Sequence, residues 1–301
     1  MDTFLIVDGN SLACRAILAH NPENGKDLCT SDGRVTGGVL RFFNMFDKIL
    51  HQFKPSHIVI CWDTNNNTLR HKLDSNYKHK RIKSQSEKPF IGSQFDYIRT
   101  ILEKVGIVNI NLEGYEGDDL VGTFTNKSKA DNVFIITGDK DSFQLVDTNI
   151  NVVYPLNGFS KCEIVDAKWI LNKYNIASWQ FCDYKMLYGD KSDCIDGLVG
   201  CGEKTAIKLL NEYGSVKDII KNKNQLAVNK KIKANLDDFI NRMKILEQLV
   251  TIKRDVPVNI SYEDCKVKLN WNKAFLLFQD LECYSLVTKL HNHKFFGQDG
   301  D

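Results

Sequence analysis

The chain carries a series of short, strongly β-branched runs, several of which end on an aspartate. FLIVD closes on Asp8, HIVICWD closes on Asp63, and VFIITGDKD carries Asp139 and Asp141 just past its last β-branched residue. Between these runs lie helical patterns such as LRFFNMFDKILHQF and FDYIRTILEKV. The alternation predicts βαβ units and a largely parallel sheet with helices on both faces. We expect strands at 3–8, 57–63, 107–112, 133–138 and 151–154.

Acidic residues gather in five short clusters along the chain. These are Asp8; Asp63; Glu116, Asp118 and Asp119; Asp139 and Asp141; and Asp190 and Asp193. Ligands of open α/β sheets bind outside the carboxyl ends of the strands, so the clusters are expected to converge there. So many carboxylates in one crevice would raise each other's pKa unless cations neutralised them. The pattern therefore predicts a site for divalent cations, with Mg²⁺ or Mn²⁺ favoured over zinc by the hard oxygen ligands.

A simpler explanation exists for some of these acids, because acids in a first helical turn favour the helix dipole. Asp118 and Asp119 stand at the start of an expected helix, and Asp141 could cap one that begins near Ser142. Capping needs only one acid per helix, however, and it leaves Asp8 and Asp63 unexplained.

The charge of the chain is nearly balanced, yet its distribution is uneven. Net charge is +2, with 40 basic and 38 acidic residues. Residues 70–88, RHKLDSNYKHKRIKSQSEK, hold seven Lys or Arg against two acids. A basic segment among acidic clusters suggests phosphate binding beside a metal centre. A connection of this length without its own core is usually functional or mobile.

After Pro155 the pattern becomes helical. WILNKYN is followed by SWQFCDYKMLYG with Ser178 as candidate N-cap, EKTAIKLLNEYG stopped by Gly214, and SVKDIIKN capped by Ser215. Asp190 and Asp193 stand three apart, so both can face one ion on a tight loop. The following VGCGEKTA indicates a hairpin between helices that can meet a DNA phosphate, although a purely structural hairpin fits too. A P-loop is excluded, since Glu203 precedes Lys204 and no strand comes before it.

Cysteine usage and hydropathy indicate a soluble, cytoplasmic protein. The nine cysteines are odd in number and form no CxxC pair, so we expect them reduced and mostly buried. The sequence contains no cluster of cysteines and histidines, so we do not expect a zinc site. No apolar stretch approaches the roughly 20 residues needed to span a bilayer. The last residues, GQDGD, are expected to be a frayed polar end.

Five motifs, in order, resemble the metal-dependent 5′-nucleases, namely the 5′→3′ exonuclease domain of bacterial DNA polymerase I and its stand-alone phage and bacterial relatives. They are FLIVDGNSLACR, VICWDTNNNTLRHKLDSNYKHKR, GYEGDDLVGTF, ITGDKDSFQLV and GDKSDCIDGLVGCGEKTAIKLL. The resemblance implies an α/β nuclease domain over 1–172 with a basic helical arch at about 70–93. It also implies a helix-hairpin-helix DNA-binding domain over 173–290 and a polar tail over 291–301. No pattern for a polymerase is present, so we expect the nuclease alone.

The resemblance also assigns roles to individual residues. It places Asp8, Asp63, Glu116, Asp118 and Asp119 around a first metal ion, and Asp139, Asp141, Asp190 and Asp193 around a second. Arg70, Tyr77, Lys78 and Arg81 match the active-site face of the arch. Val199, Gly200 and Gly202 match a hairpin that binds K⁺ through backbone carbonyls. Where the family usually has Asn and Pro, this chain has Cys194 and Asp196, and Arg41 replaces a small residue.

These matches predict a structure-specific hydrolase of phosphodiester bonds near a 5′ end of DNA. Two divalent ions would act together, with Lys78 and Arg81 stabilising the transition state and Tyr77 stacking on an unpaired base. Lys80, Lys83, Lys204 and Thr205 would contact the nucleic-acid backbone. Expected partners are a flap, a nick or a single-strand/duplex junction, with RNA-DNA hybrids also compatible, and the protein is expected to be monomeric. The alternatives are a non-catalytic DNA-structure-binding protein and a PIN-type ribonuclease, but PIN domains are typically shorter and lack the arch and the hairpin.

Overall fold

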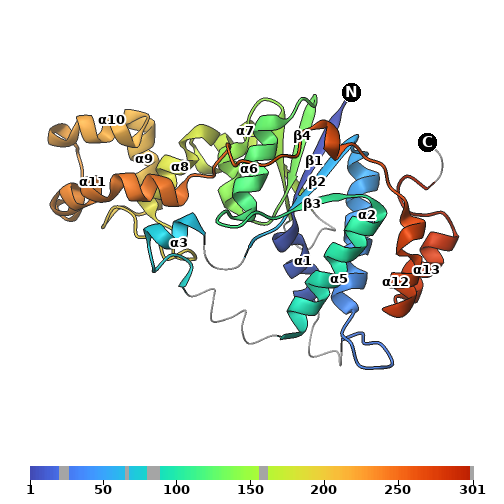
Figure 1. Ribbon diagram of the computed structural model, residues 1–301. Coiled ribbons are helices and arrows are strands. Elements are labelled where there is room, and N and C mark those ends of the chain that lie inside the picture. Colours follow the sequence, from blue (N-terminus) through green and yellow to red (C-terminus); the bar gives the residue numbers. More distant parts are fainter. Residues whose placement is uncertain (20–26, 65–67, 80–88, 156–161, 299–301) are drawn as a thin grey trace.

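A six-stranded sheet forms the centre of the molecule (Figure 1). The computed structural model describes residues 1–19, 27–64, 68–79, 89–155 and 162–298. The strand order is β3-β2-β1-β4-β5-β6; β1 to β5 are parallel, and β6 is antiparallel to β5. The strands are β1 Thr3–Asp8, β2 His57–Cys61, β3 Val108–Ile110, β4 Asn132–Ile136, β5 Ile150–Pro155 and β6 Cys162–Val165. Five were predicted, whereas the edge strand β6 was missed because only Val165 in it is buried.

Both faces of the sheet are covered by helices, as predicted. Phe4 and Ile6 of β1 pack into one apolar cluster and Leu5 and Val7 into another, which is why the strand is an unbroken apolar run. The Leu5 face is covered by α1 Gly9–Leu18, α2 Gly37–Phe53 and α5 Pro89–Val105. The Phe4 face is covered by α6 Gly117–Lys127 and α7 Ala167–Tyr174. The fold is therefore mixed α/β.

Helix α1 begins directly after β1, and a short helix begins soon after β4, so the acids at these strand ends also cap helices. The carboxylate of Asp8 accepts the Ser11 N–H at 2.9 Å at the start of α1. Asp139 caps the short helix η2 Lys140–Leu145 by accepting the Asp141 N–H at 3.0 Å. The alternative explanation, in which Asp141 caps this helix, does not hold, because the cap lies two residues earlier at Asp139. The same strand-to-helix turns thus explain why these acids cap helices and why they lie at one edge of the sheet.

The segment 178–250 is mainly helical and extends to one end of the molecule (Figure 1). Its elements are η3 Ser178–Gln180, α8 Phe181–Tyr188, α9 Glu203–Tyr213, α10 Val216–Lys221, η4 Lys223–Gln225 and α11 Lys230–Val250. Gly214 ends α9 with a φ of +88°, and the side chain of Ser215 caps α10, as predicted. Ser178 is the first residue of η3 and not its cap, because Ala177 holds that position and donates its N–H to Gln180.

After α11 the chain returns to the α/β domain, along the top of Figure 1. The Val267 N–H donates to the Ser56 carbonyl at 2.9 Å, which fastens this segment beside β2. The remaining elements are η5 Glu263–Cys265, η6 Trp271–Ala274, α12 Phe275–Asp280 and α13 Tyr284–His291. Three of these elements, η6, α12 and α13, pack in the apolar cluster on the Leu5 face of the sheet, although the predicted second domain, 173–290, includes them. The bounds of that domain stay a prediction. Within the predicted tail, 291–301, Phe295 is 2% exposed and stacks on Trp271 with ring centroids 4.4 Å apart.

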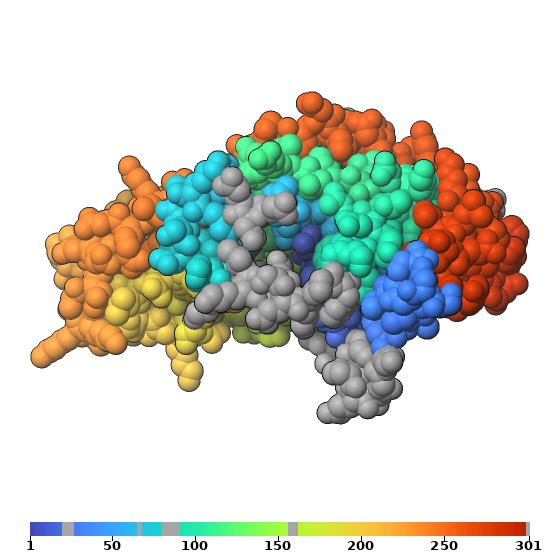
Figure 2. Space-filling view, turned by 60° about the horizontal axis from the view of Figure 1, so that its bottom comes forward, coloured from blue at the N-terminus to red at the C-terminus, as the bar shows by residue number. Residues whose placement is uncertain are grey.

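The expected arch is described only at its two ends. Helix α3 Leu69–Leu73 and the turns up to His79 form one end, and α5 forms the other. Figure 2 shows a hollow between these two segments, with part of the N-terminal segment visible in dark blue at its bottom. In the portion of the chain that the structure describes, no helix is long and apolar enough to cross a membrane.

Candidate metal centre

Asp8 is the last residue of β1 and is 8% exposed. The Thr137 hydroxyl donates to its Oδ2 at 2.7 Å, while Oδ1 accepts the Ser11 N–H. Burial, followed by the charge of Asp63, raises the pKa of Asp8 to about 7. A cation beside this carboxylate would favour its charged form.

Asp63 and Asp118 complete the cluster from two further elements. Asn10 Oδ1 accepts the Asp63 N–H at 2.9 Å, and Asp63 Oδ1 accepts the Gly117 N–H at 2.7 Å. These bonds tie the end of β2 to the starts of α1 and α6. Burial, followed by the charges of Asp139 and Asp8, raises the pKa of Asp118 well above its ordinary value. The strand-end acids were predicted to converge, and their charges do interact across the ends of β1, β2 and β4.

Glu116 connects the cluster to the base of the expected arch. Its Oε2 accepts hydrogen bonds from the Tyr77 hydroxyl and the Lys78 ammonium, each at 3.0 Å, and lies 3.3 Å from Arg70. Burial alone would lower the pKa of Lys78, but the charge of Glu116 and other acids raises it well above its ordinary value. The Lys78 N–H also donates to the Asp193 carbonyl at 3.0 Å. Lys78 thus links the two groups of acids.

Lys78 adopts a backbone conformation that is uncommon for residues other than glycine. Its φ is +51°, in the left-handed region. Such strain persists where the surrounding structure holds it, and it clusters at functional sites. Here the bonds to Glu116 and Asp193 hold the residue.

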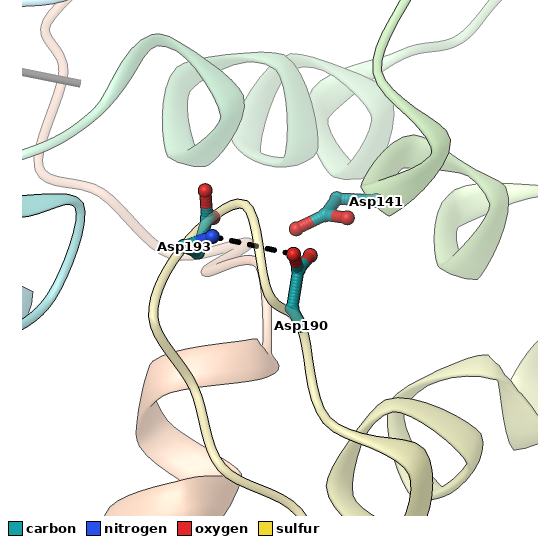
Figure 3. A group of neighbouring side chains, drawn as sticks. All are labelled: Asp141, Asp190 and Asp193. Carbon is teal, nitrogen blue, oxygen red and sulfur yellow. Dashed lines mark hydrogen bonds between the residues drawn. The ribbon is translucent and has the colours of Figure 1, made fainter. Parts of the chain in front are cut away.

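The second group of acids consists of Asp141, Asp190 and Asp193 (Figure 3). One ligand atom from each lies within 4.8 Å of the others, so together they could hold a metal ion. Asp190 Oδ1 accepts from the Ser192 N–H at 2.8 Å and from the Asp193 N–H at 3.3 Å, which closes the loop tightly. Burial, followed by the charge of Asp139, raises the pKa of Asp141 to about 7. These three predicted ligands are therefore brought together, from η2 and from the loop after α8.

Lys185 is a member of this group that sequence reasoning missed. Its ammonium, on α8, pairs with Asp141 and lies 2.7 Å from Asp190. Although burial opposes the shift, the charge of Lys185 lowers the pKa of Asp190 below its ordinary value. The available signal was a lysine on a helix rich in apolar residues, five positions before Asp190. A lysine that is 6% exposed is almost always paired.

Three predicted site residues have a different environment from the one expected. Both oxygens of Asp119 bind Arg70, each at 2.8 Å, and one also accepts the Lys253 N–H. Neighbouring helical residues do not face the same way, so Asp118 joins the acids while Asp119 points to Arg70.

Arg70 and Tyr77 are buried, and their polar groups form hydrogen bonds within the protein. Arg70 is 4% exposed and also donates to the Leu249 and Thr251 carbonyls, at 3.0 and 2.6 Å. Tyr77 is 3% exposed, so its ring is not available to stack on a base in this conformation. In the structure Arg70 pairs with Glu116 and Asp119, and Tyr77 donates to Glu116; contact of either side chain with nucleic acid stays a prediction.

The remaining predicted residues lie in the hairpin or outside the described part of the chain. Arg81, Lys80 and Lys83 are outside the described residues. Gly200 turns the hairpin with a φ of +89°, and Val199 beside it is 41% exposed. Gly202 precedes α9, whose first turn carries Lys204 and Thr205 at the surface side. Their contacts with K⁺ or phosphate remain predictions.

Family comparisons match almost the whole chain. Residues 3–175 match the 5′-3′ exonuclease N-terminal resolvase-like domain, and residues 176–273 match the 5′-3′ exonuclease C-terminal SAM fold. The chain belongs to the 5′-3′ exonuclease family. The acidic cluster fits this family, whose members are nucleases that depend on divalent metal ions.

Similar curated proteins are bacterial DNA polymerases I. Those of Lactococcus lactis and Bacillus subtilis are each 33% identical, over 271 and 290 residues. The alignments cover 89% and 95% of this chain but only 30% and 32% of the relatives. The chain thus spans about a third of the length of the polymerases that it matches.

Solved structures of nucleases share the fold. The 5′-exonuclease of bacteriophage T5, solved with zinc ions, superposes with a TM-score of 0.66 at 20% identity, covering 82% of this chain and 89% of that one. Flap endonuclease-1 of Methanococcus jannaschii superposes with a TM-score of 0.63 at 15% identity, covering 96% and 91%. A T5 flap endonuclease structure with a TM-score of 0.66 contains DNA and metal ions.

Proposed function

We propose that this member of the family is a structure-specific 5′-nuclease, which cuts DNA near a 5′ end by exonuclease and flap-endonuclease cleavage. The observation that carries the proposal is the link between the two groups of acids through Lys78. Its ammonium meets Glu116 and its backbone N–H meets the carbonyl of Asp193. Carboxylates alone would repel a phosphate, whereas paired metal sites with a lysine beside them would attract it.

The donor set fits two divalent ions of the Mg²⁺ or Mn²⁺ type. Asp8, Asp63, Asp118 and Glu116 would hold one, and Asp139, Asp141, Asp190 and Asp193 the other. When bound, the ions would activate a water molecule and share the charge that develops on the phosphate. Raised pKa values of Asp8 and Asp141 agree with this, because buried carboxylates of this kind need a cation to stay charged at neutral pH.

Lys78 is the described residue best placed to contact the reacting phosphate. Its pKa is raised well above the ordinary value, so it stays charged, and its left-handed backbone fixes its place between the two acidic groups. It would stabilise negative charge on the phosphate as a fixed cation, without transferring a proton. We propose the same electrostatic role for Arg81, from the arch.

The hairpin would bind the duplex part of the substrate at a distance from the bond that is cleaved. Carbonyls around Val199 to Gly202 would bind K⁺, and Lys204 and Thr205 at the N-terminus of α9 would meet a phosphate. These contacts carry no sequence information. Cleavage should therefore depend on DNA structure and fall with rising salt.

The test is a 5′-labelled flap duplex incubated with the protein and Mg²⁺. Wild type should release short 5′ products, and Asp139→Ala should lose nearly all activity. Asp131→Ala is the matched control, since this exposed residue lies before β4 while Asp139 follows it. Lys78→Ala should slow single-turnover cleavage and leave duplex affinity near normal. Uncut flap with wild type, or full activity of Asp139→Ala, would refute the proposal.

A further inference from the structure

A cavity of about 530 Å³ opens beside the second group of acids. Its lining includes Asp139, Asp141 and Asp190 together with tyrosines of α7 and α8 and Tyr154 of β5, which form an aromatic wall. Its volume lies in the range of small-molecule sites. Neither the metal ligands nor the hairpin accounts for the aromatic wall.

The aromatic wall ends in a ring that is held firmly and yet exposed. Tyr184 is 6% exposed and packs against Tyr174 and Phe181, with ring centroids 6.1 and 5.6 Å away. Tyr188 stacks on Tyr184 with centroids 5.6 Å apart and an interplanar angle of 22°. Tyr188 itself is 45% exposed. Its orientation is therefore set by the protein while part of its surface faces solvent.

Tyr188 is also close in sequence to the predicted metal ligands. Gly189, with a φ of +85°, turns the chain directly from Tyr188 to Asp190. A side chain at Gly189 would meet backbone atoms of Ile195 and Gly197 at 2.7 to 2.8 Å, so this turn has no room to change. Lys140 and Lys191 add positive charge at exposed positions of the cavity wall.

We propose that this cavity is a nucleotide subsite, in which one unstacked base of the strand being cut lies on Tyr188 with its phosphate toward the carboxylates. This deepens the proposed function and rests on it. A phosphate at the acids has a nucleoside attached on each side, and the base loses its stacking partners when the phosphate leaves the duplex. Stacking on an aromatic side chain replaces that loss without selecting a sequence.

The subsite can be tested by binding, without any cleavage. Calorimetry would compare 2′-deoxyadenosine 5′-monophosphate with 2-deoxyribose 5-phosphate, which lacks the base, both in Mg²⁺. Wild type and Tyr188→Phe should bind the nucleotide roughly tenfold more tightly than the sugar phosphate. Tyr188→Ala should lose that difference. Tyr284→Ala, which removes a 63% exposed ring on α13, should keep it.

Equal binding of the two probes by wild type would overturn the subsite, as would an unchanged preference in Tyr188→Ala or a lost one in Tyr284→Ala. Cleavage then gives a second measurement. Wild type should cut a flap substrate with an abasic residue beside the scissile phosphate about tenfold more slowly than the intact flap. Tyr188→Ala should cut the two substrates at the same rate. A penalty of equal size in both proteins would also refute the subsite. If wild type binds the nucleotide preferentially but does not cut the flap, the proposed function is refuted and the subsite is not.

Discussion

The ammonium nitrogen of Lys185 lies 2.7 Å from Oδ2 of Asp190, inside the group of acids that could hold a metal ion. The same ammonium pairs with Asp141. Lys185 therefore pairs with two of the three carboxylates that could bind a divalent ion. Ion binding at this group should involve a shift of the lysine away from at least one carboxylate.

Lys185→Met should destabilise the metal-free protein by about 3–5 kcal/mol, because it leaves buried carboxylates without their partner. Divalent ions should recover part of this loss, so Mg²⁺ should raise the melting temperature more in the variant than in wild type. Thermal unfolding in EDTA and in Mg²⁺ measures both effects. Lys217→Met, which removes an exposed ion pair with Glu247, should change stability by less than about 1 kcal/mol. A variant as stable as wild type in EDTA would contradict the prediction.

Stability of the metal-free protein should fall as pH rises from roughly 4 to 7. The pKa values of Asp8 and Asp141 are raised to about 7 in the folded protein, so the folded state binds more protons than the unfolded state in this window. Each group can contribute a slope of up to about 1.4 kcal/mol per pH unit. Urea unfolding in EDTA at several pH values measures it. Asp8→Asn should flatten the slope and Asp131→Asn should not; a rise in stability across the window in wild type would be the opposite of what is expected.

Arg70→Met should cost about 3–5 kcal/mol of stability, because Asp119 would remain buried without its partner. If Arg70 instead served nucleic-acid binding, the variant would weaken DNA affinity with little loss of stability. Equilibrium unfolding and DNA binding of the same variant separate the two roles. In the double variant Arg70→Met with Asp119→Asn, the losses should be far from additive, since the residues share one network.

Cys194→Asn should stabilise the protein by up to about 1 kcal/mol. Cys194 has a φ of +59°, and asparagine tolerates the left-handed region better than most other residues. Cys194→Val should have the reverse effect, since a β-branched side chain is strained there. The urea midpoint measures both changes, and equal midpoints for the two variants would argue against backbone strain at this position.

Much of the fold could be predicted because its signals are local. The apolar runs of β1, β2 and β4 have both faces buried, so each appears as an unbroken run in the sequence. Helix ends at Gly214 and Ser215 follow from the backbone preference of glycine and the capping ability of serine. The convergence of acids follows from parallel strands, whose carboxyl ends share one edge.

Other features depend on which side chains meet across the fold. Adjacent acids at 118 and 119 look alike in the sequence, yet the helix turns one toward the other acids and the other toward Arg70. Edge strand β6 shows almost no burial pattern. Phe295 was expected in a polar C-terminal tail because its partners, Trp271 and Phe278, lie in other elements.

The sequence by itself determined the α/β class, the order of the motifs and the acids that surround the expected metal ions, because residue periodicity and strand-to-helix turns encode them locally. Only the tertiary structure decided that Lys185 neutralises Asp141 and Asp190, that Arg70 and Tyr77 support Glu116 from the interior, and that residues 251–298 return to the α/β domain. The physical reason is that charge pairing and burial depend on distances between elements remote in sequence. No local pattern specifies those distances.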